Sequence, residues 1–224
     1  MKNDKIWITF TILACLSLLN FGSRYIYDVP QALAGEFMSR FSVKQDNIEL
    51  LYALDSIPGI FMAFLAGFIV TLISPLNTSL LCTYLIFISA ILTAWGVHSE
   101  KYWMIVLGRL VYGIFGEPLI VAQSTLLSIW FTGNSLSFAS GLIQSMNNAG
   151  LAFSNWMTPV IFEKTENLFS PFYWAAILCA MSVVCCIVYS YIDIKYGGSM
   201  LDKEAQNGAE SHLIKFEYFN DLKS

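Results

Sequence analysis

Residues 108–118 read GRLVYGIFGEP, and the apolar run continues from there to residue 130. The stretch is apolar enough to cross a bilayer, yet it holds Arg109, Glu117 and the helix-breaking Pro118. A charged side chain at membrane depth costs about 2.5–3.5 kcal/mol on insertion scales, so such residues usually face a polar cavity or a partner. Pro118 lacks the backbone N–H that a helix needs, and three nearby glycines allow the backbone to bend or another helix to approach. This combination is typical of a helix that lines a transport pathway.

The composition is that of an integral membrane protein. Of the 224 residues, 56% are hydrophobic and 12% are charged, which is not the profile of a soluble domain. The net charge of −4 offers no basic surface for nucleic acid. The five cysteines all fall inside apolar runs without metal-ligand spacing, so we expect buried thiols and no metal. The sequence holds no P-loop, dinucleotide fingerprint or nucleophile–base arrangement, so we expect neither an enzyme nor a cofactor.

Six apolar stretches are long enough to span a membrane, since a transmembrane helix needs about 20 mostly apolar residues. They are residues 6–30, 48–73, 79–98, 103–130, 136–161 and 170–193. Tryptophans near several of the ends support this division, because their rings settle at the headgroup level. We therefore predict an all-α transmembrane bundle over residues 1–193, with both termini in the cytoplasm. Residues 194–224 are polar and predict a cytoplasmic tail or the start of a central linker.

Two of these spans carry small residues at every fourth position. The rows are Gly59, Ala63 and Gly67 in the second span, and Ser137, Gly141, Ser145 and Ala149 in the fifth. Helix association in lipid relies on close van der Waals contact, so we expect both rows to pack against other helices. The alternative is the ordinary richness of membrane spans in glycine and alanine.

Three charged residues in the first two spans have two interpretations each. Arg24 and Asp28 are four residues apart on one helical face and are expected to pair, either at the interface or lining a cavity. Pro30 is expected to end or kink that helix. Asp55 lies a turn or two into the second span, where we favour the interface. At greater depth it would be a candidate proton-binding or substrate-binding carboxylate.

Glu117 lies near the middle of the fourth span, too deep to reach the surface easily. Arg109 is eight residues away along the same helix, a separation of about 12 Å, so each residue needs a partner elsewhere or water. We predict a functional role for Glu117. Uncharged polar residues on the fourth and fifth spans predict a polar cavity between these helices, with interhelical hydrogen bonding as the alternative. They are Gln123, Gln144, Asn147 and Asn148.

Several short motifs resemble the major facilitator superfamily, and within it the branch of the lysosomal dipeptide transporters. They are FGS at 21–23, YDVP at 27–30, LLYA at 50–53, the 108–118 stretch, VAQ at 121–123 and WFTG at 130–133. The resemblance implies a twelve-helix alternating-access carrier, with a substrate site between two six-helix halves built from inverted three-helix repeats. This chain would be the N-terminal half, either a truncated gene product or a functional half.

The resemblance also implies an activity, which is export of dipeptides or related amino-acid compounds down their gradient, as a uniporter. Glu117 would meet the amino end of the peptide. The expected partners are the small-molecule substrate, the lipid bilayer, the missing C-terminal half or a second copy, and a glycosylated accessory membrane protein. The expected location is a lysosomal or other internal membrane, with the plasma membrane as the alternative.

The residues that we predict to contact substrate come from four spans. They are Tyr27, Asp28, Tyr52, Arg109, Glu117, Gln123 and Asn148. Glu117 or Asp55 would carry a proton if transport is proton-coupled.

Departures from the family pattern favour a second hypothesis. The residues after Gly67 lack the charges of the family's gating motif. The fifth span has neutral Asn147 or Asn148 where the dipeptide branch places an arginine, so a charge-assisted contact is replaced by a weaker neutral one. The alternative function is therefore a non-transporting membrane scaffold or accessory subunit that keeps the fold.

Overall fold

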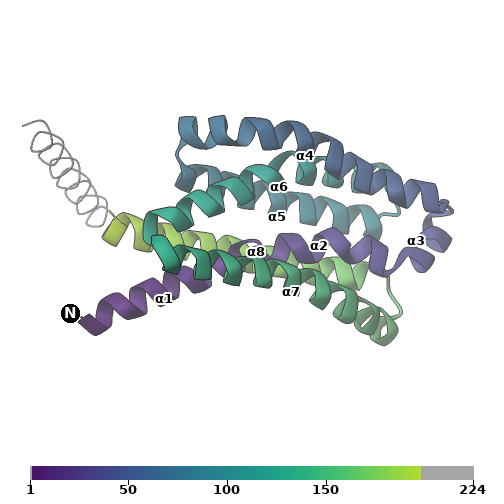
Figure 1. The fold of residues 1–224 in the computed structure, drawn as a ribbon. Helices are drawn as coiled ribbons and strands as arrows, with labels where there is room; N and C mark the ends of the chain where they lie inside the picture. The colour runs from purple at the N-terminus through teal and green to yellow at the C-terminus, as the bar shows by residue number, and fades with distance from the viewer. Residues whose placement is uncertain (1, 198–224) are drawn as a thin grey trace, which may run out of the picture.

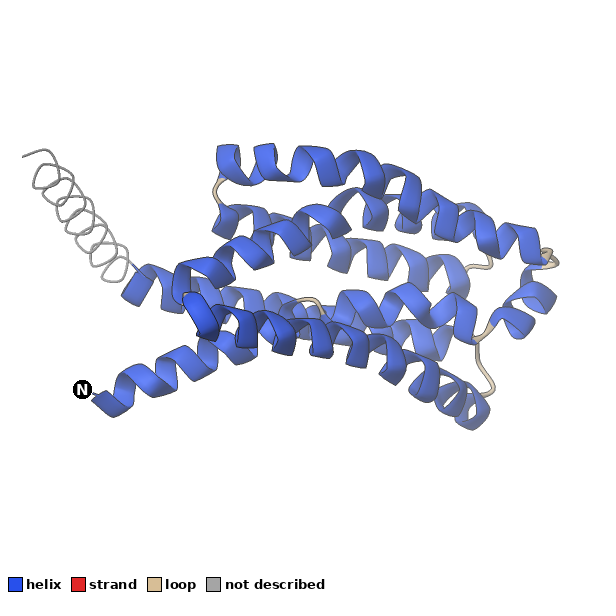
Figure 2. Cartoon of the chain, viewed as in Figure 1, coloured by secondary structure: helices blue, strands red, loops and turns tan. Residues whose placement is uncertain are grey.

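The computed structural model describes residues 2–197, and the regular structure in that range is entirely helical (Figure 1, Figure 2). The elements are α1 (Lys2–Leu19), α2 (Phe21–Ala32), α3 (Ala34–Phe41), α4 (Gln45–Ile73), α5 (Pro75–His98), α6 (Tyr102–Trp130), α7 (Gly133–Thr165), α8 (Phe169–Ile192) and the π-helical turn η1 (Asp193–Gly197). The all-α prediction is confirmed. Most of the expected tail, residues 198–224, lies outside the described residues, and η1 follows α8 directly over the first residues of that tail.

The long helices form two groups that run along a common direction (Figure 1). In one group α6 packs against both α4 and α5, and in the other α2 lies between α7 and α8, with α1 beside α8. Contacts between α5 and α8 join the two groups. The beginning of α1 and the end of α8 lie at the same end of the bundle, and α3 lies at the opposite end (Figure 1). An apolar core made by residues such as Leu51, Phe172 and Ile105 fills the interior.

The first expected span is two helices, not one. Helix α1 ends at Leu19 and α2 begins at Phe21, with Asn20 between them. Just after this break, Gly22 lets the backbone of α2 lie against the backbone of α8. A Cβ atom at Gly22 would lie 2.6 Å from the carbonyl oxygen of Leu178 on α8. The expected end of the helix at Pro30 is displaced by two residues, since α2 continues to Ala32.

Five helical segments are long and apolar enough to cross a membrane. They are Trp7–Ala32, Gln45–Ile73, Pro75–His98, Tyr102–Trp130 and Phe169–Tyr196. The expected span at 136–161 lies within α7, which has 33 residues and runs beside α2 along the bundle (Figure 1). It falls short in apolarity because serine and asparagine residues recur along it.

Neither row of small residues packs as expected within the described part of the chain. Gly59 is buried against α6, but Ala63 and Gly67 on the same helix are exposed. The row on α7, from Ser137 to Ala149, is exposed throughout. A Cβ atom added at Gly67 or at Gly141 would meet no atom within 4 Å. The packing prediction is therefore wrong for contacts within this chain, because these faces point away from the other described helices.

Candidate functional site

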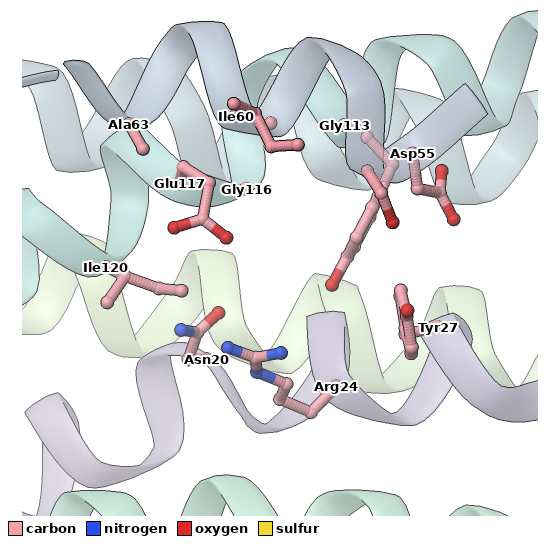
Figure 3. A pocket seen from close by; sticks show the side chains of 13 residues that line it. Asn20, Arg24, Tyr27, Asp55, Ile60, Ala63, Gly113, Gly116, Glu117 and Ile120 are labelled. Carbon is pink, nitrogen blue, oxygen red and sulfur yellow. The ribbon is translucent and has the colours of Figure 1, made fainter. Parts of the chain in front are cut away.

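A cavity of about 320 Å³ lies between α2, α4 and α6 (Figure 3). This volume is at the lower end of the range for small-molecule sites, about 300–1,000 Å³. Exposed residues such as Ser56 and Ile60 form part of the wall, so the cavity opens at the surface of the chain. The polar side chains of its lining are Asn20, Arg24, Tyr27, Asp55, Ser56, Tyr112 and Glu117. The sequence predicted a polar cavity between the fourth and fifth spans, whereas the structure forms it with α2 and α4 instead of α7.

Glu117 and Arg24 line this cavity from different walls. The Glu117 carboxylate projects from α6, and the Arg24 guanidinium projects from α2 (Figure 3). Within residues 2–197 neither side chain makes a hydrogen bond or an ion pair. The cavity therefore presents one negative and one positive group that are both available to a bound solute.

Arg109 and Asp55 form a buried ion pair, in which Asp55 also lines the cavity and Arg109 lies behind it. The Nη1 atom of Arg109 lies 2.8 Å from Oδ2 of Asp55, and each side chain is only 3% exposed. This pair confirms that Arg109 finds its partner outside its own helix. Asp55 is buried between α4 and α6, and its interfacial position in the membrane stays a prediction. Its second oxygen, Oδ1, has no hydrogen-bond partner among the described residues, and the residue also lines the cavity.

The same arginine explains how α2 continues past a proline. Pro30 has no N–H, so the carbonyl of Ile26 lacks its helical donor. The Nη2 atom of Arg109 donates a hydrogen bond to that carbonyl at 3.3 Å and a second one to the carbonyl of Tyr27 at 2.9 Å. Arg109 thus ties α2 and α4 to α6.

Tyr52 makes a similar connection from α4 to α2. Its hydroxyl donates to the carbonyl of Tyr27 and accepts from the N–H of Gln31, both at 3.2 Å. The guanidinium carbon of Arg109 lies 5.2 Å from the centre of the Tyr52 ring and 5.8 Å from that of Tyr27, within cation–π range. These contacts fix the Tyr27 ring in the cavity wall.

Gln123 stabilises the break between α1 and α2. Its Nε2 donates to the carbonyl of Leu16 at 2.6 Å, and its Oε1 accepts from Nδ2 of Asn20 at 3.5 Å. The break would otherwise leave the last carbonyls of α1 without donors. Gln123 therefore positions Asn20, which reaches the cavity.

Asp28 and Asn148 lie away from the cavity lining. Asp28 accepts a short hydrogen bond from Nδ2 of Asn155 on α7. The expected pair between Arg24 and Asp28 is wrong, because the described residues contain no such ion pair and Arg24 faces the cavity instead. Asn148 is exposed on α7, whereas the neighbouring Asn147 is buried.

The structure thus divides the seven predicted contact residues into three sets. Tyr27 and Glu117 line the cavity, and Arg109, Tyr52 and Gln123 hold its walls from behind. Asp28 and Asn148 do neither. The prediction missed Asn20 and left Arg24 undecided. Their spacing with Tyr27, at positions 20, 24 and 27, repeats with the period of one helical face, and this signal is present in the sequence.

Comparison with known proteins identifies related sequences over nearly the whole chain. The family model described as Major Facilitator Superfamily matches residues 11–219. Curated relatives include the lysosomal dipeptide transporter MFSD1 of Mus musculus at 29% identity, of Homo sapiens at 28% and of Danio rerio at 27%. Each alignment covers 94% of this chain and 47% of the relative. The chain therefore spans about half the length of the curated relatives that it matches.

Proposed function

Because the chain belongs to the Major Facilitator Superfamily, we propose that it forms one half of an alternating-access membrane transporter for small solutes. In this proposal the six spans are the α1–α2 pair, α4, α5, α6, α7 and α8, arranged as two inverted three-helix repeats. The cavity between α2, α4 and α6 is one side of the substrate pathway. Rocking against a second half exposes it alternately to the two sides of the membrane.

The observation that carries this proposal is the pair of unpaired charges in the cavity. A charged side chain can bind a solute only if it is not already paired with another group of the protein. Both Glu117 and Arg24 meet that requirement among the described residues. Arg109 and Asp55, by contrast, neutralise each other in a buried ion pair. The scaffold alternative gives no reason to keep two unpaired charges at membrane depth, where each is costly.

The charges favour a dipeptide or related amino-acid compound as the substrate. Such a solute carries an ammonium group at one end and a carboxylate at the other. Glu117 would accept hydrogen bonds from the ammonium group, and Arg24 would donate to the carboxylate, so both contacts would be charge-assisted. Arg24 then supplies from α2 the cation that the neutral Asn147 and Asn148 do not supply from α7. The names of the relatives, lysosomal dipeptide transporters, support this substrate class and a lysosomal or other internal membrane.

The remaining predicted residues take supporting roles in this proposal. Arg109, Tyr52 and Gln123 keep the wall in shape, and Asp28 fixes α2 to α7 through Asn155. Asn148 is exposed and is available to the second half of the pathway. That half would be a C-terminal bundle or a second copy of this chain. A glycosylated accessory membrane protein stays a proposed partner on the family resemblance alone.

The test measures dipeptide binding to the purified chain, because binding needs only the cavity whereas flux also needs the second half. We expect Glu117→Gln and Arg24→Gln each to lower binding about tenfold, because each removes one charge-assisted contact. Glu49→Gln is the matched control, since Glu49 is exposed on α4 and outside the cavity lining. Equal, background-level dipeptide binding by the wild type, Glu117→Gln and Arg24→Gln would contradict the transporter proposal and support the scaffold.

A further inference from the structure

An apolar groove lies on the outer face of the bundle, between α5 and α8. Its volume is about 620 Å³. The walls are formed by Trp95 on α5 and Tyr173 on α8, which are 60% and 54% exposed, and the buried Ala94 and Ala176 leave space between the helices. Both helices belong to candidate membrane spans, so the groove opens toward the hydrocarbon of the bilayer.

A polar cavity of about 680 Å³ adjoins this groove at the end of the bundle where α3 lies (Figure 1). Two residues, His98 and Phe169, line both spaces, and the centres of their rings are 5.0 Å apart. The charged lining of the polar cavity comes from α3, with Glu36 and Arg40, and from the residue that follows α7, Glu166. The two spaces therefore adjoin at these rings, with an apolar lining along the spans and a charged lining at their end.

The charges of the polar cavity indicate the class of headgroup that fits. It has two carboxylates, Glu36 and Glu166, and one guanidinium, Arg40. Arg40 contacts Glu100 at 2.5 Å, but both side chains are more than half exposed, and such surface pairs contribute little. Arg40 can therefore donate to a phosphate. A headgroup with an ammonium group beside a phosphate matches this arrangement, whereas an anionic headgroup would face an excess of carboxylate.

We propose that this site binds phosphatidylethanolamine, with one acyl chain in the α5–α8 groove and the headgroup in the adjoining polar cavity. The primary ammonium group carries N–H donors for Glu36 and Glu166, which a quaternary choline lacks. Arg40 from α3 and His98 from α5 both line this cavity, and in this proposal they bind the phosphate. The site shares no lining residue with the cavity of Glu117 and Arg24, so it does not depend on the proposed transport function.

The first test fills the groove. The chain is reconstituted in nanodiscs with equimolar phosphatidylethanolamine, phosphatidylcholine and phosphatidylglycerol and then transferred to a mild detergent, and the retained lipid is identified by native mass spectrometry. Ala180→Trp adds a large ring to the groove lining, and Val184→Trp adds the same ring one helical turn later, outside the groove and at a position that is 58% exposed. We expect the wild type and Val184→Trp to retain one phosphatidylethanolamine molecule and Ala180→Trp to lose it, with unchanged helical circular dichroism in all three.

The second test changes the headgroup cavity without altering the groove. Glu36→Gln combined with Glu166→Gln should lower the retained ratio of phosphatidylethanolamine to phosphatidylglycerol about two- to fivefold. Glu163→Gln, an exposed residue of α7 outside both linings, should leave the ratio unchanged. Equal lipid retention by Ala180→Trp and Val184→Trp would overturn the proposal. So would an unchanged ratio in the double variant, or a second copy of the chain in place of lipid in the wild type.

Discussion

Helix α6 carries two charged residues at membrane depth, and the structure treats them in opposite ways. Arg109 is buried, pairs with Asp55 on α4 and donates to two carbonyls on α2. Glu117, eight residues later in the same helix, faces a cavity and has no hydrogen-bond or ion-pair partner in residues 2–197. A charge in a membrane protein can thus serve to join helices or to meet a solute, and its contacts distinguish the two roles.

The two arrangements differ in what removal of a side chain leaves behind. A buried ion pair is costly to desolvate, and removal of one partner leaves an uncompensated charge in the interior. A charge that faces a cavity is already solvated, so its neutral analogue leaves no such defect. Variants on the two sides should therefore separate loss of stability from loss of binding.

The largest loss of stability is expected for Arg109→Leu. It leaves Asp55 buried without its cation and the Ile26 carbonyl without its donor, while the Tyr27 carbonyl keeps its bond from Tyr52. The free energy of unfolding should therefore fall by about 3–5 kcal/mol. The measurement is unfolding in detergent micelles, followed by circular dichroism. The double variant Arg109→Leu with Asp55→Leu should recover much of the loss, because an apolar pair carries no buried charge. A double variant as unstable as the single one would show that the ion pair is not the cause.

A smaller loss is expected for Gly113→Ala, which lies between the two charges. A Cβ atom at Gly113 would overlap the carbonyl oxygen of Asp55 and lie 2.8 Å from its Cα. Overpacking of this kind costs about 1–3 kcal/mol of unfolding free energy. Gly116→Ala is the matched control, because the nearest atom to its new Cβ would be a ring carbon of Tyr112 at an ordinary 3.7 Å. Equal melting temperatures for the two variants would contradict close packing of α4 on α6.

The third expected effect is that of Tyr52→Phe, which removes the hydroxyl that joins α4 to α2. The carbonyl of Tyr27 keeps its bond from Arg109, and the N–H of Gln31 is exposed to water. We therefore expect a loss of about 1 kcal/mol, the usual net value of one hydrogen bond. Tyr84→Phe, at an exposed position on α5, should change the unfolding free energy by less than about 0.5 kcal/mol. An unchanged free energy of unfolding in Tyr52→Phe would show that Arg109 alone holds the end of α2.

Glu117→Gln should have the smallest effect on stability, within about 0.5 kcal/mol of the wild type. Because the carboxylate has no partner in the described chain, its neutralisation breaks no contact there. Thermal unfolding of Glu117→Gln beside Arg109→Leu gives the sharpest form of the comparison. A Glu117→Gln variant as unstable as Arg109→Leu would mean that both charges are structural.

The sequence predicted the helical class and the need of Arg109 for a distant partner, because both follow from apolar run length and from the cost of an unpaired charge. It did not predict that the partner is Asp55, 54 residues away. The hydropathy pattern gives the depth of a residue in the membrane only approximately. A shift of one helical turn is enough to move a residue from the membrane interface to the interior. The break at Asn20 also escaped prediction, because no glycine or proline occupies that position and its stabilising contact comes from Gln123 on another helix.

The polarity of α7 marks the limit of reading spans from composition. Its asparagines and serines lower its apolarity, but some of them are buried against other helices, such as Ser154 and Asn147, and do not face lipid. Which face of a helix meets a neighbour depends on the packing of the other helices. A hydropathy average does not contain that information.

The seating of Gly113 on the backbone of Asp55 has a mechanical consequence. The two helix backbones are too close there for α4 to glide along α6, and the neighbouring ion pair resists twisting of one against the other. During any conformational change we expect α4 and α6 to move together as one rigid body. The bending is then expected in the segments that connect these two helices to the rest of the chain.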